Sequence, residues 1–360
     1  MDHLARPPLE ALVRRIVVLG GAGLFGRKLM EQLRHWGHAP LAASRRPGLD
    51  LRIDAEDSAS LHSALRPNDL VLDAAGPYQH RSMRLIEAAM EIGCDVIDLN
   101  DHLGYAEKVL ELSPTIESAG RTVCSSASSV SAVSAAVLRV SGLERPVRLC
   151  AFLAPASRHT ANLGTAKSLL ESLNRPIRVL REGQLHECGG WSEPRRFAMP
   201  QPVGTIRGRL FESADSVYLP AAHPSLREVA MYVDTNTFGL NGLLQLAARS
   251  AIVRRVFTLA LRPGVHLAKW LGSKAGGIGY EIEDVSGRVE RYFLCSAEQG
   301  YWVAVAPALL AARRILADTM PRRGMSLPHE QVEPRELFGF LEGSGIVLEA
   351  ETAPPAGLSG

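Results

Sequence analysis

The chain has 360 residues, of which 46% are hydrophobic and 22% charged, and its formal net charge is +2. This balance is typical of a soluble globular protein long enough for two domains, and the scattered basic residues argue against a nucleic-acid partner. Five cysteines lie far apart without a C-x-x-C pair, so we expect reduced thiols, no disulfide framework and no metal site.

The first 15 residues lack the long apolar core and the small-residue cleavage site of a secretion signal. Together with the dispersed cysteines, this favours a cytoplasmic location.

The first 140 or so residues alternate between strand and helix patterns. Short apolar runs rich in β-branched residues predict strands, and apolar residues at helical spacing predict helices between them. We expect strands at 16–19, 40–44, 49–54, 69–76, 94–99 and 121–126, with helices within 25–36, 56–65 and 83–92. Strands separated by helices imply a parallel sheet with right-handed crossovers.

A glycine-rich turn follows the first predicted strand and precedes the first predicted helix. Its glycines, Gly20, Gly21, Gly23 and Gly26, fit both G-x-G-x-x-G and G-x-x-G-x-x-G. Positions without a Cβ allow a pyrophosphate to approach the backbone, and the N-terminus of the helix favours its negative charge. Such a motif alone is weak, because glycine turns also simply connect elements, but its place in a βαβ unit predicts dinucleotide binding.

The end of the second predicted strand indicates which dinucleotide binds. NAD enzymes carry an acidic residue about 20 positions after the glycines, which binds a ribose 2′-hydroxyl. This chain has Ser44, Arg45 and Arg46 there and no carboxylate. Two guanidinium groups suit a 2′-phosphate, which favours NADP(H) over NAD(H), although two solvated loop arginines are the alternative.

Polar residues also follow the fourth and fifth predicted strands, at the edge where open α/β sheets bind ligands. Gly76 and Pro77 would turn the chain beside the nicotinamide half of the cofactor. Candidate substrate-pocket residues and proton donors are Tyr78, His80, Asp98 and His102. For each of them the alternative is an ordinary hydrogen-bonded loop residue, and the sequence assigns no catalytic residue.

The pattern changes near Pro146. A strand at 147–156, a helix at 165–173 capped by Thr165, and short extended segments up to about 237 are expected. A hairpin at 279–298 folds about Ser286 and Gly287, and helices follow at 303–319 and 334–341.

Residues 240–271 are apolar but interrupted by four arginines and by Pro263-Gly264, so they do not form a spanning helix. One interpretation is a pair of core-facing helices. The other is a basic amphipathic surface that contacts a membrane or a lipophilic substrate.

The chain resembles the saccharopine reductase-like (saccharopine dehydrogenase) family of NADP-dependent oxidoreductases. The resemblance rests on "VVLGGAGLFG", "VLDAAGPYQHRSMRLIEAAMEIGCDVIDLN", "NLGTAKSLLESL" and the C-terminal stretch that begins "GYWVAVAPALL". The loop "CSSASSVSA" departs from the Gly-Pro-containing loop common in the family, so an amino-acid substrate is not carried over.

The resemblance implies an α/β fold: an N-terminal Rossmann domain with a doubly wound parallel sheet, an inserted domain with a mixed sheet, and C-terminal helices that return to the first domain. The corresponding ranges are 1–143, 144–300 and 301–352, followed by a frayed tail at 353–360. The inserted domain would hold the substrate and a homodimer contact.

The resemblance also implies where the cofactor lies. Gly20, Gly23, Leu24, Phe25 and Gly26 would hold the phosphates, and Ser44 to Arg46 the adenosine end. Asp54 and Ala55 would lie by the adenine, and Ala75 to Tyr78 by the nicotinamide ribose.

Three functions remain open from the sequence. The first is an NADP-dependent oxidoreductase acting on a C=N, C=O or activated C=C bond of a small molecule. The second is a non-catalytic NADP-binding protein, and the third is a peripheral membrane-associated reductase of a lipophilic substrate. The sequence has no Tyr-x-x-x-Lys, G-x-S-x-G or H-E-x-x-H motif, which argues against a short-chain dehydrogenase, a serine hydrolase and a zinc protease.

Overall fold

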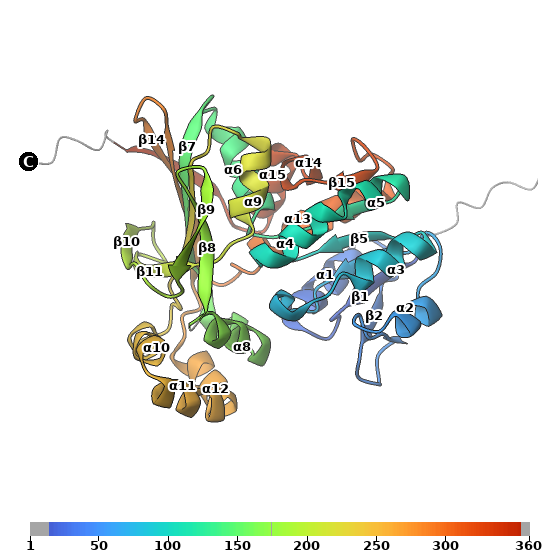
Figure 1. Ribbon diagram of the computed structural model, residues 1–360, viewed down its shortest axis with the longest axis horizontal. Coiled ribbons are helices and arrows are strands. Elements are labelled where there is room, and N and C mark those ends of the chain that lie inside the picture. The colour runs from blue at the N-terminus through green and yellow to red at the C-terminus, as the bar shows by residue number, and fades with distance from the viewer. Residues whose placement is uncertain (1–13, 174, 354–360) are drawn as a thin grey trace, which may run out of the picture.

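The computed structural model describes residues 14–173 and 175–353 (Figure 1). Residues 1–13, within the N-terminal stretch expected not to be a secretion signal, and residues 354–360 of the expected tail lie outside this range. Ala353, where the tail was expected to begin, is instead the last residue of the strand Leu348–Ala353. The described chain forms two sheets with helices around each of them.

The first sheet is parallel throughout and has the strand order β15-β6-β5-β4-β1-β2-β3. Its strands are β1 (Ile16–Leu19), β2 (Leu41–Ser44), β3 (Leu51–Arg52), β4 (Leu70–Asp73), β5 (Asp95–Asp98), β6 (Thr122–Cys124) and β15 (Gly324–Ser326). The helices between them are α1 (Leu24–His35), α2 (Ser58–Ala64), α3 (Arg84–Ile92), α4 (Leu103–Glu111), α5 (Ser113–Ser118) and α6 (Ala132–Ser141), with a short 3₁₀ helix η1 (Tyr78–His80). This arrangement confirms the predicted Rossmann-like sheet and adds a seventh strand to it.

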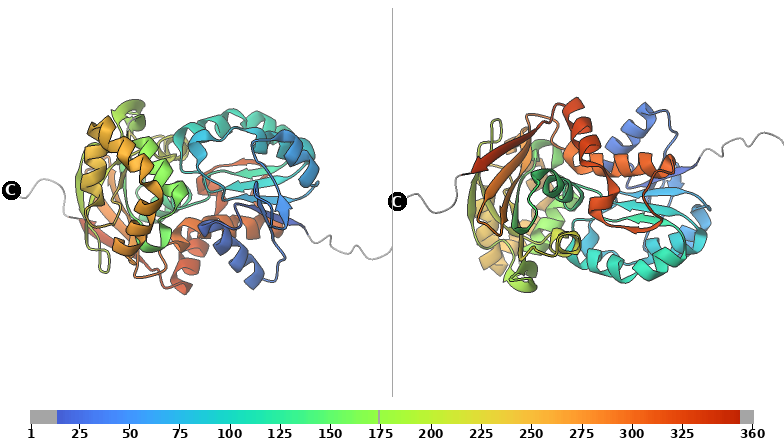
Figure 2. Two further views of the ribbon diagram at one scale, coloured as in Figure 1. Left: turned by 90° about the horizontal axis from the view of Figure 1, so that it is seen from below. Right: turned by 90° about the horizontal axis from the view of Figure 1, so that it is seen from above.

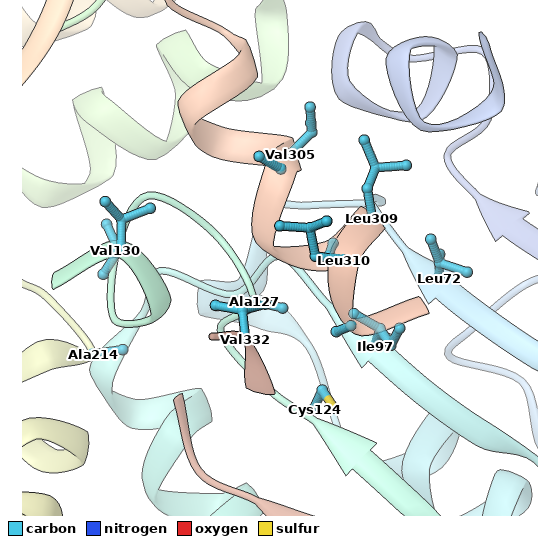
Figure 3. Packing of buried hydrophobic residues seen from close by; sticks show 14 of the residues in the cluster. Leu72, Ile97, Cys124, Ala127, Val130, Ala214, Val305, Leu309, Leu310 and Val332 are labelled. Atoms are coloured by element: carbon cyan, nitrogen blue, oxygen red, sulfur yellow. The ribbon is translucent and has the colours of Figure 1, made fainter. Parts of the chain in front are cut away.

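The C-terminal part of the chain returns to this sheet. It supplies β15, α13 (Trp302–Leu316), α14 (Pro328–Gln331) and α15 (Pro334–Gly343). Helix α13 packs against α1, β5 and β6. Figure 3 shows Leu309 of α13 near Leu72 and Ile97 of the sheet, and all three side chains are at most 1% exposed. The core of the first domain is therefore built from both ends of the chain.

The second sheet is mixed and runs in the order β10-β11-β12-β7-β13-β14-β16, with the hairpin β8–β9 attached to β12. Its strands are β7 (Pro146–Ala154), β8 (Pro176–Arg181), β9 (Gln184–Gly189), β10 (Arg195–Ala198), β11 (Thr205–Phe211), β12 (Glu228–Val233), β13 (Gly276–Asp284), β14 (Val289–Ser296) and β16 (Leu348–Ala353). The helices of this region are α7 (Ser157–Thr160), α8 (Leu163–Ser172), α9 (Asp215–Ala222), α10 (Leu240–Arg249), α11 (Ala251–Leu259) and α12 (Leu261–Leu271).

Two details differ from the sequence interpretation. Residues 301–352 do not all return to the first domain, because β16 pairs antiparallel with β14 at the edge of the second sheet. The helix expected to start at Thr165 begins at Leu163, because the side chain of Asn162 caps it by accepting the amide of Thr165.

Helices α10, α11 and α12 form a layer at the end of the second domain, below the sheet in Figure 1. Figure 2 (left) shows the same helices from below. Helix α12 packs against α7, α8 and α11. None of the described helices is long and apolar enough to cross a bilayer.

Candidate functional site

The loops that follow β1, β2, β4, β5 and β6 gather at the carboxyl edge of the parallel sheet. Strand β1 lies between β2 and β4, so the chain winds to one side of β1 first and then to the other. The crevice at this reversal point is where open α/β sheets bind dinucleotides.

The glycine turn joins β1 to α1 and leaves no room for side chains. Gly20 has a φ of +72°, and a Cβ there would lie 2.8 Å from the carbonyl oxygen of Ala74. A Cβ at Gly26 would lie 2.1 Å from the oxygen of Gly20, and one at Gly21 would lie 2.8 Å from the Cβ of Ala42. The turn is therefore packed tightly against α1, β2 and the loop after β4.

Helix α1 starts without a side chain that caps it. Gly23 is its N-cap residue and its own amide donates to the oxygen of Gly20 at 2.7 Å. Gly23 is exposed, while Leu24 and Phe25 are half-buried. The first amides of the helix can therefore bind an anion, and the cradle that a Cβ would fill fits a pyrophosphate group.

The two arginines after β2 are exposed at the same edge of the sheet. The backbone turns here because the amide of Arg46 donates to Oγ of Ser44 at 3.0 Å. Arg45 and Arg46 are both exposed, and neither forms an ion pair within residues 14–173 and 175–353. Their charges are available to a ligand.

The carboxylates near these arginines are engaged in their own loops. One oxygen of Asp50 accepts the amide of Ala42 at 2.8 Å. One oxygen of Asp54 accepts the amide of Glu56 at 3.0 Å, and the neighbouring Ala55 is 7% exposed. One oxygen of each carboxylate therefore stabilises its own loop.

The loop after β4 is held by a buried ion pair that the sequence reasoning did not find. Arg81 lies 2.6 Å from a carboxylate oxygen of Asp73 and also donates to the carbonyl of Ala75 at 3.2 Å. Its Nε lies 3.1 Å from an oxygen of Glu56. Burial alone would lower the pKa of Arg81, but the charge of Asp73 raises it above its ordinary value, so the guanidinium stays charged.

Tyr78 is part of the wall of the site. Its hydroxyl donates to the carbonyl of Asp73 at 2.6 Å and accepts the amide of Leu99 at 3.2 Å. The side chain is 5% exposed, and burial raises the pKa of its hydroxyl well above the ordinary value. These contacts favour a role in shaping the loop rather than in donating a proton.

Asp98 lies at the end of β5 and is fully buried. Its Oδ1 accepts the amides of Asn100 and Ser126 and the hydroxyl of Ser125 at 2.8–3.1 Å. Its Oδ2 is buried without a hydrogen-bond partner among the described residues. Burial raises the pKa of Asp98 to about 7, so the carboxyl is easily protonated where it lies.

His80 and Gln79 connect the first domain to α8. Nε2 of His80 lies 2.7 Å from an oxygen of Glu171, and Gln79 donates to the hydroxyl of Ser168. The side chain of His80 is 52% exposed. His80 is therefore accessible to a ligand and is oriented by a carboxylate from the second domain.

His102 makes a similar contact but is more enclosed. Its Nε2 lies 3.0 Å from an oxygen of Glu212, and its Nδ1 is buried without a hydrogen-bond partner in the described part of the chain. The side chain of Asn100 bridges this loop to the next one, since it accepts the amide of His102 and donates to the hydroxyl of Ser126.

The sequence reasoning also missed Glu171 and Glu212. Only the folded structure reveals these two residues. Glu171 lies on α8 and Glu212 directly follows β11, and the sequence places neither of these elements beside the first sheet. Arg81 and Glu56 had a local signal: both border loops already assigned to the cofactor.

Two cavities help to place the site. One of about 450 Å³ is lined by Gly21, Ala42 and residues of α1, so it lies beside the glycine turn. A larger one of about 770 Å³ lies in the second domain, where Trp191, Arg209 and Arg249 are among its lining residues. Within residues 14–173 and 175–353, the glycine turn combines a tight turn, an uncapped helix N-terminus and nearby unpaired arginines, which makes it the candidate cofactor site.

Comparison with known proteins gives a family match over part of the chain, which begins after the glycine turn. Residues 41–124 match the family described as "Saccharopine dehydrogenase NADP binding domain". Comparison of the sequence with curated proteins finds no match.

Among solved structures, one shares the fold and another matches only weakly. Saccharopine dehydrogenase (L-Glu forming) from Saccharomyces cerevisiae matches with a TM-score of 0.62 and 14% identity, over 95% of this chain and 100% of that chain. GenD2 from gentamicin A biosynthesis, in complex with NAD, matches with a TM-score of 0.43 and 12% identity, over 97% of this chain and 99% of that chain. The first of these structures shows a saccharopine dehydrogenase-like fold over 95% of this chain.

Proposed function

We propose that this saccharopine dehydrogenase-like protein is an oxidoreductase that uses NADP(H) and acts on a C=N, C=O or activated C=C bond of a small molecule. The observation that carries the proposal is the pairing of a glycine cradle without side chains after β1 with two exposed arginines after β2. The match of residues 41–124 to an NADP-binding family supports it.

Three loops each bind a different part of the cofactor. The amides of Leu24 and Phe25 bind the pyrophosphate, because they lie at the uncapped start of α1, and Gly23, whose own amide donates to Gly20, leaves room for it. Arg45 and Arg46 bind the 2′-phosphate with charge-assisted hydrogen bonds. The loop from Ala75 to Tyr78, fixed by Arg81 and Asp73, lies along the nicotinamide ribose.

The nicotinamide, when bound, supplies or accepts the hydride. The protein then has to place a proton at the reacting bond, and His80 is the group that we assign to this task. Its imidazole is half exposed, and Nε2 lies 2.7 Å from a carboxylate oxygen of Glu171, which orients the ring. His102 is the weaker candidate, since its Nε2 is directed at Glu212 and its Nδ1 is buried.

The decisive experiment combines binding with turnover. NADPH and NADH are titrated by fluorescence, and oxidation of the bound nicotinamide is followed with a panel of imines, ketones and activated alkenes. His80→Gln should bind NADPH as the wild type does but turn over at least about 100-fold more slowly, the lower end of the usual contribution of a general acid.

A protein that binds NADPH tightly but oxidises it with no member of the panel would favour a non-catalytic NADP-binding protein. Equal binding of NADPH and NADH would contradict the assigned cofactor. The homodimer and the cytoplasmic location expected from the sequence stay predictions.

A further inference from the structure

The outer surface of α10, α11 and α12 is unusually apolar. Nine of the thirteen exposed large hydrophobic residues of the described chain lie between residues 238 and 271. They are Phe238, Leu243, Leu246, Ile252, Val256, Leu259, Leu267, Trp270 and Leu271. Such a concentration exceeds the scattered exposed side chains of an ordinary surface and indicates an interaction site. We call this surface, with the cations described next, the helical face.

The helices that carry the helical face bury little. Helix α10 buries only Leu244 and Ala247, α12 buries only Val265, and no residue of α11 is buried. The exposure of Ile252 is 79%, that of Leu259 81% and that of Trp270 77%. Of the two sequence interpretations of 240–271, the core-facing one applies to the inner side of the layer, where Leu244 and Ala247 of α10 pack with Leu173 and Trp191. Helix α12 packs on α7 and α8. The outer side of the layer is exposed.

The charge of this segment has one sign. Residues 235–280 contain no aspartate or glutamate, and they contain six arginines and lysines. Arg249, Arg254, Arg255, Arg262 and Lys269 form no ion pair with any described residue, while Lys274 pairs with Glu298 at 3.4 Å. Five cations without an ion pair thus lie in the same segment as the nine exposed apolar side chains. Arg249 also lines the cavity beside Trp191 and Arg254 donates to the carbonyl of Ala247, while Arg255, Arg262 and Lys269 are exposed.

This composition distinguishes between two occupants. In a twofold dimer the same patch meets itself, so five unpaired cations would face five others without a compensating carboxylate. Like charges placed opposite one another oppose association. An anionic lipid surface instead offers a negative charge for the arginines and lysines and an apolar boundary for leucine, isoleucine and tryptophan side chains.

We propose that the helical face docks the protein on a membrane surface that contains anionic lipids. The apolar side chains of α10–α12 enter the boundary between headgroups and acyl chains, and the cations contact the headgroups. The docking layer also reaches the proposed site: α12 packs on α8, which carries Ser168 and Glu171. The proposal does not depend on the proposed oxidoreductase activity.

The test measures binding of the full-length protein to vesicles by flotation. Vesicles of phosphatidylcholine alone are compared with vesicles of phosphatidylcholine and phosphatidylglycerol, at low and high salt. We expect binding only to the anionic vesicles and weaker binding in high salt, because the lipid attraction is screened.

Two variants separate the apolar and the charged contributions. Ile252→Ser/Leu259→Ser/Trp270→Ser should lose binding even at low salt, and Arg255→Glu/Arg262→Glu should weaken it by about fivefold or more for each charge removed. Val285→Ser and Arg335→Glu are matched controls, because both residues are exposed and lie outside α10–α12. The controls should bind as the wild type does.

NADPH affinity and melting temperature confirm that each variant is folded, since the substituted side chains are exposed. The proposal is overturned if the wild type binds neither kind of vesicle, or binds both equally. It is also overturned if the wild type is a dimer that the triple serine variant converts to a monomer in sedimentation, which would make this face an interface between copies.

Discussion

The guanidinium of Arg81 lies 2.6 Å from the carboxylate of Asp73, with side-chain exposures of 8% and 0%. Removing one partner of a buried pair leaves the other charge without compensation, which typically costs about 3–5 kcal/mol. Arg81→Met should therefore lower the free energy of unfolding by that amount in urea denaturation. The double variant Arg81→Met/Asp73→Asn should recover most of the loss. A loss of less than about 1 kcal/mol in the free energy of unfolding of Arg81→Met would contradict this prediction, because such small effects are typical of exposed ion pairs.

Two glycines of the turn should respond differently to substitution. Gly23 has a φ of −71°, which other residues adopt, and is exposed. A Cβ at Gly23 would lie 3.0 Å from the oxygen of Gly20, a tight contact but a milder one than at Gly26, so Gly23→Val should fold with some loss of stability. Its side chain would occupy the place of the pyrophosphate, and we expect NADPH affinity to fall by about 100-fold or more, the effect of losing two charge-assisted hydrogen bonds. Gly26→Ala should instead destabilise the fold, because its Cβ would meet the oxygen of Gly20 at 2.1 Å.

Fluorescence titration and thermal melting separate these two effects. Wild-type affinity in a folded Gly23→Val variant would refute the assignment of the turn to phosphate binding. A Gly26→Ala variant as stable as the wild type would show that the turn can relax.

The two arginines after β2 should determine cofactor preference. Each contact with a 2′-phosphate is worth about 1.5–3 kcal/mol, so losing one should weaken NADPH binding about 10- to 150-fold. NADH lacks this phosphate, and its affinity should hardly change in Arg45→Ala or Arg46→Ala. Arg66→Ala provides a matched control on another exposed loop. The assignment fails if both variants keep a strong NADPH preference.

The buried carboxyl of Asp98 should make stability depend on pH. Its pKa of about 7 lies above the ordinary value of 3.8, so between these values the native state holds a proton that the unfolded state has lost. Stability therefore falls as pH rises through this window. Asp98→Asn cannot ionise, and its stability relative to the wild type should grow by roughly 2–4 kcal/mol between pH 4 and pH 8. The measurement is urea denaturation of both proteins across this range, and a constant difference would contradict it.

Much of the first sheet could be predicted from the sequence. The predicted runs 16–19, 69–76 and 94–99 contain β1, β4 and β5. These strands could be recognised because buried parallel strands consist mostly of consecutive apolar residues. Strand β15 has only three residues and no periodicity, so its pairing with β6 depends on contacts made far along the chain. The same holds for β16, which the sequence analysis assigned to the first domain.

The candidate site was likewise predictable only in part. The loops after β1, β2, β4 and β5 could be predicted because they follow strands whose carboxyl ends share one edge. The partners of these loops could not: Glu171 meets His80 across 91 residues, and this contact exists only once the second domain is folded. Local patterns carry no information about it.

A fragment of residues 1–143 should not fold by itself. It lacks β15, which completes the sheet, and α13, whose inner side chains cover β5 and β6. It also lacks Gln331, whose buried amide donates to the carbonyl of Ser125 at 2.8 Å. Circular dichroism of the fragment should show no cooperative melting, whereas residues 1–143 linked to 301–346 should recover it. A cooperatively melting fragment would contradict the structural role of the C-terminal part.

The origin of both sheets in distant parts of the chain also has a consequence for synthesis. A ribosome releases β1 to β6 first, but the strand and helix that complete their sheet are made only after the second domain, and β16 is made later still. Domains usually fold as units during synthesis, the N-terminal one first. Here the nascent first domain keeps an unpaired sheet edge and an uncovered apolar face until α13 and β15 have been made. Premature termination near the C-terminus would thus remove both domains together, and chaperone contact during translation would be needed most for the earliest part of the chain.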